Sequence, residues 1–270
     1  LQLIVHPSLI WAPTLKSLHI LHTEAASGWG GQEIRVFQEA TLLLERGYRV
    51  SVACRTGSPL EEHCRSFSDS RFNFKSIKMD RTFSLEAFIA LHQYINKIGP
   101  DVIHTHSSID SWLGGVVGKF SGIPVVRTRH VSLPVRSFFP NHLLYSYIPE
   151  RILTSGDAIS DMVKKIRYVD PRKVVSIPAG VDLCRFNPAI SGKKIREEFK
   201  VKPGQPLVGK IGVIRGWKGH DYFLEAIPLI LKQIPDARFM IVGDGPGFEQ
   251  IKFKIRTAGL EDRIALPGHR

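Results

Sequence analysis

Short runs rich in valine and isoleucine alternate with helix-length segments along almost the whole chain, and this alternation constrains the fold more than any other feature. Continuous apolar strands are typical of parallel sheets covered by helices on both faces. The strand candidates are Leu18–Leu21, Arg49–Ala53, Phe72–Ile77, Val102–His104, Val125–Arg127, Arg151–Leu153, Val174–Ile177, Leu207–Ile211, Arg238–Val242 and Ile264–Leu266. The helix candidates are Gln32–Arg46, Leu85–Lys97, Ser111–Phe120, Ile159–Arg167, Tyr222–Gln233 and Phe248–Ala258. We therefore predict an α/β fold with parallel sheets.

The length of 270 residues suits two domains better than a single core. The segment from Cys184 to Pro206 interrupts the alternation with polar residues and with the turn-forming pairs Asn187-Pro188 and Pro203-Gly204. We place the boundary near residue 190, with one Rossmann-like domain over residues 1–190 and a second over residues 191–270. The second segment offers only strand–helix–strand–helix–strand, about half of a doubly wound sheet, so we expect this domain to be incomplete.

The composition excludes several classes of protein. No window approaches twenty uninterrupted apolar residues, so a membrane-spanning helix is not expected. The apolar residues 1–13 include Pro7 and Pro13 and lack a basic start, which is not typical of a signal peptide. The three cysteines, Cys54, Cys64 and Cys184, are odd in number and form no CxxC pair, so they indicate neither a disulfide framework nor a zinc site. Together these features favour a cytoplasmic protein.

The net charge is +12, from 37 basic and 25 acidic residues, and both halves of the chain share the excess. A nucleic-acid-binding protein more often concentrates its charge in a stripe with interleaved aromatic residues, so we expect no nucleic-acid partner. Spread positive charge suits anionic small substrates or a negatively charged membrane surface. The aromatic stretch at residues 136–147 has two interpretations, a surface that docks on a membrane interface or a buried helix of the first domain.

A glycine-rich loop lies between the first predicted strand and the first predicted helix, with Gly28, Gly30 and Gly31 followed by Gln32. Glycines let a ligand approach the backbone, and a helix start offers free N–H groups and the positive end of its dipole. The spacing is not GxGxxG and no acidic residue closes the second strand, which counts against a dinucleotide site. The loop is therefore either a tight turn that needs glycine or a site for a phosphate or a sugar hydroxyl.

Histidines follow two predicted strands. His104 and His106 lie at the end of one strand, and His130 follows the next. Open α/β sheets bind ligands at the carboxyl ends of their strands. We expect His104 and His106 to point to opposite faces of an extended strand, and therefore not to share a metal ion. We favour His106 or His130 as a group in the cleft, and the alternative is packing between sheet and helix.

A basic loop at residues 212–219 follows the first strand of the second domain, and a helix begins just beyond it. Gly212 and Gly216 open the backbone, while Arg215 and Lys218 present a guanidinium fork and an ammonium group to neighbouring phosphates. The GxxxxGK[ST] pattern of a P-loop is absent. A solvated basic turn is the alternative interpretation.

A second loop, Gly243, Asp244 and Gly245, follows the next strand of the same domain. It is typical of a loop that lines a nucleotide cleft, although a plain turn between strand and helix explains it nearly as well. The helix after the basic loop is expected to have Asp221 as its N-cap.

Taken in order, these motifs resemble the retaining GT-B glycosyltransferases of the "glycosyl transferases group 1" family, which includes sucrose, mannosyl and lipopolysaccharide transferases. The resemblance covers nearly the whole chain from about Leu18. It rests on GWGGQE at 28–33, DVIHTH at 101–106, TRH at 128–130, IPAGVDLCRFNP at 177–188, GVIRGWKG at 212–219 and IVGDGPG at 241–247. The order and spacing of these motifs are much more specific than any one of them.

The resemblance implies two Rossmann-like domains around a cleft, with the acceptor mainly on the first and the sugar nucleotide mainly on the second. It implies catalytic or sugar-contacting roles for His106 or His130. It implies donor-phosphate binding by Gly212, Gly216, Arg215 and Lys218. It implies sugar or acceptor binding by Gly30, Gly31 and Gln32, and a nucleotide-side loop formed by Gly243, Asp244 and Gly245.

Two features depart from the family's pattern. The basic loop of the family carries arginine directly after its first glycine, where this chain has Val213, so Arg215 must supply that charge. The later pair of glutamates that flanks the donor sugar, eight residues apart, has no counterpart before Arg270. Two interpretations follow, a minimal second domain or a fragment that lacks half of its donor pocket, and a fragment of this kind is either active or inactive on its own.

The sequence therefore predicts a metal-independent, retaining hexosyl-type glycosyltransferase without a cofactor, since the nucleotide-sugar is a substrate. Preorganised cations neutralise the leaving diphosphate in such a reaction. The expected acceptor is a saccharide or a lipid-linked glycan of the cell-envelope polysaccharide or lipopolysaccharide type. The expected location is the cytoplasm, with peripheral contact with the inner face of an anionic membrane. The alternatives are a non-catalytic module that binds nucleotide-sugars or glycans, and a GT-B sugar-nucleotide epimerase.

Overall fold

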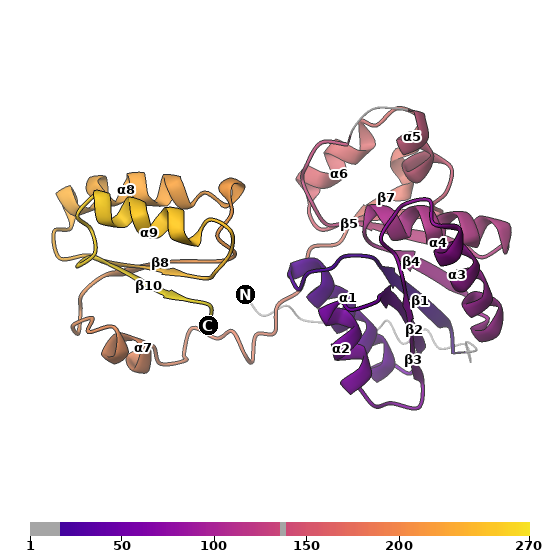
Figure 1. Cartoon of the computed structure of the whole chain (residues 1–270), viewed down its shortest axis with the longest axis horizontal. Helices are drawn as coiled ribbons and strands as arrows, with labels where there is room; N and C mark the ends of the chain where they lie inside the picture. Colours follow the sequence, from indigo (N-terminus) through magenta and orange to yellow (C-terminus); the bar gives the residue numbers. More distant parts are fainter. Residues whose placement is uncertain (1–16, 136–138) are drawn as a thin grey trace, which may run out of the picture. The chain divides into compact units, whose positions relative to one another are not determined.

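The computed structural model describes residues 17–135 and 139–270 (Figure 1). The chain forms two compact units, the first ending at Gly180 and the second beginning at Val181. The boundary was predicted near residue 190. That position lies in the polar, turn-forming segment between the last strand of the first unit and the first helix of the second. Both units are α/β, as predicted.

The first unit contains a seven-stranded sheet in the order β3-β2-β1-β4-β5-β6-β7, with every neighbouring pair parallel. Its strands are β1 (His19–Glu24), β2 (Arg49–Arg55), β3 (Phe72–Ile77), β4 (Val102–Thr105), β5 (Val125–Arg129), β6 (Arg151–Thr154) and β7 (Val174–Ser176). Its helices are α1 (Gly31–Glu45), α2 (Pro59–Ser66), α3 (Leu85–Ile98), α4 (Ser108–Phe120), α5 (Phe139–Ser146), α6 (Asp157–Lys164) and the short 3₁₀ turn η1 (Pro171–Lys173).

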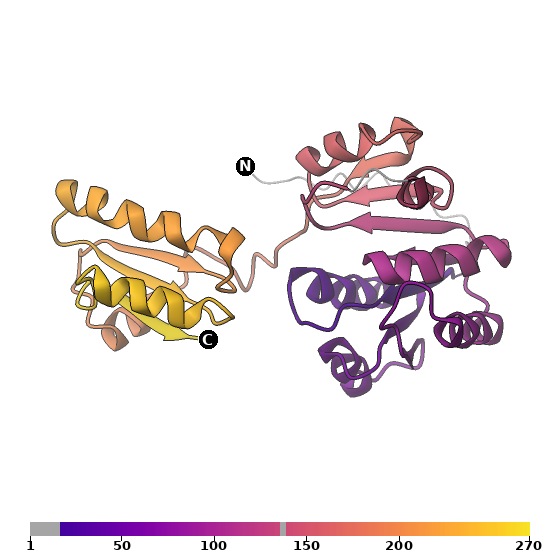
Figure 2. The same ribbon diagram turned by 45° about the horizontal axis from the view of Figure 1, so that its top comes forward.

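Helices cover both faces of this sheet (Figures 1 and 2). Val50 and Val52 of β2 pack against α1 and α2 in one buried cluster. Leu21 of β1 and Ile103 of β4 belong to a second cluster that includes residues of α3 and α4. Alternate residues of one strand point to opposite faces, so each strand contributes to both layers. This explains why the strands read as continuous apolar runs.

The second unit contains a three-stranded parallel sheet in the order β10-β9-β8. Its elements are α7 (Lys193–Glu198), β8 (Leu207–Ile211), η2 (Gly216–Lys218), α8 (His220–Gln233), β9 (Arg238–Val242), α9 (Phe248–Thr257) and β10 (Ile264–Gly268). Helices α8 and α9 lie side by side on one face of the sheet, and α7 lies on the other (Figures 1 and 2). The prediction of a second domain that forms only part of a doubly wound sheet is confirmed.

The start of α8 differs from the expectation. The helix begins at His220, directly after Gly219, which has a left-handed φ of 71° and is the N-cap residue. Asp221 is therefore inside the first turn, and its Oδ1 instead accepts a hydrogen bond from Nζ of Lys254 in α9 at 2.6 Å. This ion pair joins the two helices that cover the sheet.

Two predictions fall partly outside the described residues. Residues 1–13, considered as a signal peptide, lie outside them, and so do residues 136–138 of the aromatic stretch. The remainder of that stretch forms α5, in which Leu144 and Tyr145 are both 2% exposed. The buried-helix interpretation therefore holds for this part. No helix in the described ranges is long and apolar enough to cross a membrane.

Candidate functional site

The order of the larger sheet reverses between β1 and β4, because β2 and β3 continue from β1 in one direction while β5 to β7 continue from β4 in the other. Open α/β sheets bind ligands outside the carboxyl ends of their strands at such a switch point. The glycine-rich loop follows β1 here, and the histidines follow β4 and β5. Three of the predicted motifs therefore meet at one edge of the sheet.

Four buried or half-buried histidines lie close together at this edge. His22 of β1 is the register partner of His104 of β4. Nδ1 of His22 lies 3.0 Å from Nε2 of His106, and Nδ1 of His106 lies 3.0 Å from Nε2 of His130. The three imidazoles of His22, His106 and His130 therefore form a continuous chain of contacts from the sheet to the rim.

The expectation that His104 and His106 point to opposite faces of the strand is wrong. Side chains alternate along a strand, so residues two apart share a face. The ring centroids of His104 and His106 lie 4.2 Å apart. Each of His22, His104 and His106 offers a ligand atom within 4.8 Å of those of the other two. The prediction that His104 and His106 cannot share a metal ion relied on their pointing to opposite faces, so it loses its basis.

Burial keeps these imidazoles neutral. Desolvation lowers the pKa of His22 to about 4. Desolvation, followed by the charges of Arg35 and Arg129, lowers the pKa of His130 to about 4. Desolvation also holds the pKa of His104 and of His106 well below the ordinary value. At neutral pH each ring therefore carries one N–H and one lone pair, and acts as both donor and acceptor.

Asp110, the third residue of α4, fixes the backbone that carries His106. Its carboxylate accepts hydrogen bonds from the amides of His106 and Ser107, each at 2.8 Å, and from the hydroxyl of Thr23 at 2.9 Å. A carboxylate in the first turn also interacts favourably with the helix dipole. Asp110 is fully buried, so this network positions the end of β4 rigidly.

The glycine-rich loop is held by Glu24 and by the start of α1. Oε1 of Glu24 accepts from the amide of Ala26 at 2.8 Å, and its Oε2 accepts from Nε2 of Gln32 at 2.7 Å. Gly30 is the N-cap of α1, and its amide donates to Oε2 of Glu33 at 2.6 Å. The Gln32 amide, predicted to bind a sugar or acceptor, thus supports the loop. Gly30 and Gly31 do lie at a helix start, as predicted.

Burial raises the pKa of Glu24 to about 8, and the neighbouring charge of Asp110 adds to this effect. Glu24 ends β1 at the switch point and is wholly buried. It is therefore an acid of unusual proton affinity at the rim where ligands of this fold bind.

Arg127 of β5 points to the face opposite the histidines. It is 2% exposed, its Nη2 donates to the hydroxyl of Tyr145 at 3.1 Å, and its guanidinium carbon lies 4.3 Å from the centre of the Tyr145 ring. Desolvation lowers its pKa. Arg129, the arginine of the TRH motif, lies on the same face. Its Nη2 donates to the carbonyl of Leu133 at 2.6 Å.

Sequence reasoning missed several of these residues, namely His22, Glu24, Asp110 and Arg127. The available signal was their chemistry: each is a polar residue inside or directly beside a strand made otherwise of apolar residues. The segment HILHTE of β1 carries four polar residues, His19, His22, Thr23 and Glu24, and all are buried. Buried polar groups cost free energy unless they are paired, so their presence in a strand indicates a network or a site.

In the second unit, the two predicted donor loops pack directly on each other. The amide of Ile214 donates to the carbonyl of Asp244 at 2.9 Å, and the amide of Gly247 donates to the carbonyl of Ile214 at 3.0 Å. Gly243 has a φ of 142°, and a Cβ atom at this position would overlap the carbonyl oxygen of Gly212. Only glycine fits there, so the close approach of the loops after β8 and β9 depends on it.

The predicted donor-phosphate cations lie on the outside of this pair of loops. Arg215 and Lys218 are exposed, and the guanidinium carbon of Arg215 lies 5.9 Å from the centre of the Trp217 ring. A third cation, Lys210 of β8, lies beneath the loop: a methyl group on Gly219 would be 3.8 Å from its Nζ. The loop thus presents Arg215 and Lys218 to solvent. Lys210 is a further cation close to the loop, and it was not predicted.

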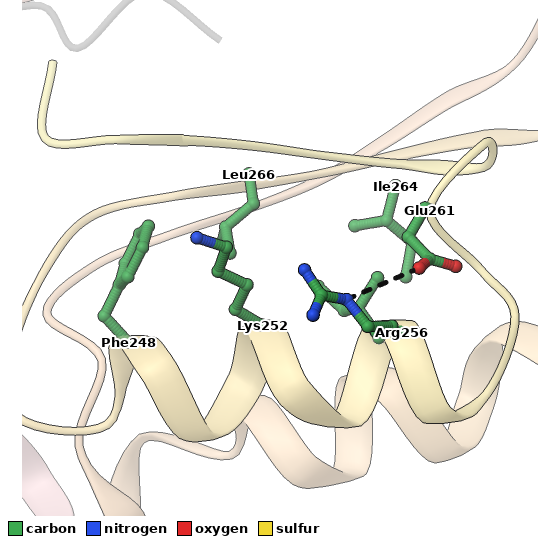
Figure 3. A pocket seen from close by; sticks show the side chains of 7 residues that line it. Phe248, Lys252, Arg256, Glu261, Ile264 and Leu266 are labelled. Atoms are coloured by element: carbon green, nitrogen blue, oxygen red, sulfur yellow. Dashed lines mark ion pairs between the residues drawn. The ribbon is translucent and has the colours of Figure 1, made fainter.

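The pocket drawn in Figure 3 lies elsewhere in this unit, between α9 and β10. It has a volume of about 220 Å³, and Phe248, Lys252, Ile264 and Leu266 line it. None of the predicted site residues belongs to its lining. A second hollow, of about 330 Å³, lies in the first unit and is apolar; its lining residues are Thr82, Phe83, Ser84, Leu85, Phe88, Trp112, Leu113 and Val116.

The fold and the site define a class: two Rossmann-like units, with a rim of buried histidines in the first and a basic, glycine-rich loop pair in the second. The model of the family "Glycosyltransferase Family 4" matches residues 29–185, and that of "Glycosyl transferases group 1" matches residues 191–270. The chain therefore belongs to the group 1 glycosyltransferases, as the sequence motifs predicted.

Individual proteins agree with this assignment. An Escherichia coli protein named UDP-Gal:alpha-D-GlcNAc-diphosphoundecaprenol alpha-1,3-galactosyltransferase is 29% identical over 277 residues, which cover 95% of this chain and 71% of that protein. The chain spans between 40% and 59% of the length of three D-inositol 3-phosphate glycosyltransferases.

Solved structures show the same fold. A glycosyltransferase from Rickettsia africae matches with a TM-score of 0.79 and 19% identity, over 94% of this chain and 69% of that one. Anabaena Alr3699/HepE, solved in complex with UDP and glucose, matches with a TM-score of 0.75 and 18% identity, over 94% of this chain and 70% of that one. The predicted GT-B architecture is therefore confirmed.

Proposed function

We propose that the protein transfers a hexose from a nucleoside-diphosphate sugar to a lipid-linked glycan, with retention of configuration and without a metal ion at the leaving diphosphate. The observation that carries the proposal is the pair of interlocked loops after β8 and β9, from which Arg215 and Lys218 reach solvent. Two adjacent cations neutralise the charge that develops on a departing diphosphate, and this is the role that a metal ion has in other transferases.

Other features support the choice of substrates. The chain is similar to an enzyme whose name specifies a UDP-sugar donor and a diphosphoundecaprenol acceptor. The apolar hollow between the start of α3 and α4 lies in the unit that carries the predicted acceptor-side residues. We propose that the hydrocarbon chain of the acceptor lies there, since this hollow is lined by Phe83, Leu85 and Trp112 among others.

We also propose that the protein works in the cytoplasm at the inner face of an anionic membrane. Phe83 and Leu85 at the rim of the hollow are 80% and 74% exposed, and the protein carries a net charge of +12. Exposed aromatic and aliphatic side chains enter the membrane interface, and positive charge attracts anionic lipid. Co-sedimentation with vesicles tests this: binding must rise with the fraction of anionic lipid, and equal recovery with neutral vesicles contradicts it.

The central experiment measures donor binding and turnover of the protein encoded by the whole reading frame. Lys218→Ala is expected to weaken UDP-sugar binding about 10-fold to 100-fold, because a charge-assisted hydrogen bond contributes about 1.5–3 kcal/mol. Lys232→Ala is the matched control, since Lys232 is an exposed lysine at the far end of α8. Unchanged donor affinity in Lys218→Ala contradicts the assignment.

The same assay tests the remaining parts of the proposal. Added Mg²⁺ or Mn²⁺ is expected to leave kcat/KM unchanged, and the anomeric configuration of the product must equal that of the donor. If the protein binds the UDP-sugar saturably, and neither transfers the sugar nor slowly hydrolyses the donor, a non-catalytic binding module is favoured instead. Conversion of the donor sugar into its epimer would favour an epimerase.

A further inference from the structure

Three imidazoles in the first unit are arranged as metal ligands. His22, His104 and His106 each offer a ligand atom, and these atoms lie within 4.8 Å of one another. Zinc binds imidazole nitrogen at about 2.0–2.1 Å, so tetrahedral ligand atoms lie about 3.3 Å apart. The separation of 3.0 Å between Nδ1 of His22 and Nε2 of His106 is close to this spacing. A small movement of one ring completes the site.

The environment of His22 is a second, independent observation. Its side chain is wholly buried, and within the described part of the chain its Nε2 has no hydrogen-bond partner. Its other nitrogen faces only another neutral imidazole. A buried polar group without a partner costs free energy and needs an explanation. Within the described residues the polar contact of the His22 side chain is thus a single one, between its Nδ1 and the neutral ring of His106, and a metal ion bound to the ring would replace this weak contact with a strong one.

The surroundings of the other two rings match those of metal-bound histidines. A histidine that binds a metal normally donates its second N–H to a carboxylate or another acceptor, which fixes its tautomer. Nδ1 of His104 lies 3.5 Å from Oε1 of Glu39, and Nδ1 of His106 lies 3.0 Å from Nε2 of His130. Ligation through Nε2 of His104 and of His106 would then replace the contacts that these atoms make with Thr128 and His22. The hydroxyl of Thr128 lies 2.6 Å from Nε2 of His104.

The donor set selects the type of ion. Imidazole suits zinc and neighbouring transition metals, whereas magnesium and calcium prefer oxygen ligands. The rings must be neutral to bind a metal, and burial lowers the pKa of all three. An ion can occupy this space without a water-sized cavity, because metal–nitrogen distances are shorter than any non-bonded contact.

We propose that His22, His104 and His106 bind a zinc ion through three imidazole nitrogens, and that this ion holds the histidines of the rim in place. The ion ties the end of β1 to the residue that follows β4, and it fixes the ring of His106 toward His130. This site contains neither Arg215 nor Lys218, so zinc binding is measured without the transfer reaction, although His106 is also a candidate residue of that reaction.

The test uses the whole chain, purified without a polyhistidine tag. Metal analysis after gel filtration is expected to find about one zinc per chain, and Co²⁺ in its place must give the intense visible absorption of a tetrahedral site. Zn²⁺ at a hundred-fold excess over its Kd is expected to raise the Tm of the metal-free protein by roughly 5–10 °C. His22→Asn and His104→Gln must lose the zinc and the Tm shift.

His92→Gln is the matched control, because His92 lies on α3, where its Nε2 is 3.1 Å from Nδ2 of Asn96 and its ring stacks on Phe88, away from the three histidines. This variant must keep the zinc and the Tm shift. The cobalt spectrum is measured on the unaltered protein, so the test stands even where a histidine variant does not fold. Absence of retained zinc together with absence of a tetrahedral cobalt spectrum overturns the proposal, and so does equal zinc retention in the histidine variants.

Discussion

Nδ1 of His106 lies 3.0 Å from Nε2 of His130, which joins the segment after β4 to the segment after β5. The sequence motifs DVIHTH and TRH each pointed to one histidine at the rim, and the structure places both in a single network. The contact means that the two residues do not act independently. Removing either one changes the tautomer and orientation of the other.

This coupling is measurable as a double-mutant cycle. We expect His130→Ala and His106→Ala each to lower kcat/KM about 100-fold, and the double variant to lose much less than the product of the two effects. His92→Ala, which alters a histidine of α3 in the same unit, serves as a comparison for general effects on folding. Losses that multiply would show that the two imidazoles work separately.

Gly243 is predicted to be irreplaceable for the shape of the donor loops. Gly243→Ala forces a Cβ into the carbonyl of Gly212 and a φ of 142° on alanine. We expect a loss of at least about 2–3 kcal/mol of stability in the second unit, measured by urea unfolding. Gly209→Ala in β8 is the control, since nothing lies within 4 Å of its Cβ position. Similar losses in the two variants would contradict the role of the close approach.

The alternation of strands and helices predicted the fold well, and the reason is physical. A strand buried on both faces must be a continuous apolar run, so β2 or β9 is visible in the sequence by itself. Helices α2 and α7 were not predicted because neither shows helical periodicity: α7 has only six residues, and α2 buries only Leu60 and Cys64 among its apolar residues. Their positions depend on packing that no local pattern encodes.

The site was predicted only in part for a similar reason. Glycines and cations in loops stand out, so the residues of the basic loop were found. His22 and Glu24 lie within a strand, where local sequence does not show that β4 will bring His104 and His106 beside them. The error over His104 and His106 concerned strand geometry itself, because residues two apart share a face. The network exists only once the sheet order is known.

The cysteines provide a test of the fold that is independent of function. Cys54 and Cys64 are buried, and the hydrogen bond to Cys54, with burial, raises the pKa of the Cys64 thiol. Cys184 is exposed. Because the thiolate is the reactive form, the native protein should react quickly with a thiol reagent at Cys184 alone. All three cysteines should react in denaturant, and Cys184→Ser should remove the fast reaction. Rapid labelling of Cys54 or Cys64 would show that this core is open.

Glu24 predicts a pH dependence of stability. Burial raises its pKa from the ordinary 4.5 to about 8, so the folded protein holds a proton that the unfolded chain releases. The stability that this bound proton gives the folded protein is fully present below the pKa of Glu24 in the unfolded chain, 4.5. It is lost as the pH rises through the pKa of Glu24 in the folded protein, about 8. Glu24→Gln keeps the side chain neutral, so the variant should match the unaltered protein near about pH 5 and exceed its stability near about pH 9. Urea unfolding at both values decides this, and parallel pH profiles would contradict it.

The proposal that the acceptor's hydrocarbon chain lies in the apolar hollow predicts how activity depends on the length of that chain. Phe83 is 80% exposed at the rim of this hollow, and its ring lies 5.7 Å from that of Trp112. Covering such a side chain with hydrocarbon contributes about 1.5–3 kcal/mol. Phe83→Ser should therefore raise KM about 10-fold to 100-fold for a long-chain lipid-linked acceptor and leave KM unchanged for a short, water-soluble analogue.

The control for this experiment is Phe253→Ser, which removes a ring of similar exposure, 68%, from α9 of the second unit. It should affect neither acceptor, because its ring does not line the hollow. The donor KM of Phe83→Ser should also stay unchanged, which separates a role in holding lipid from damage to the fold. An equal rise of KM for the long-chain and the short-chain acceptor would remove the lipid chain from this hollow and leave the position of the hydrocarbon to be sought at another surface of the first unit.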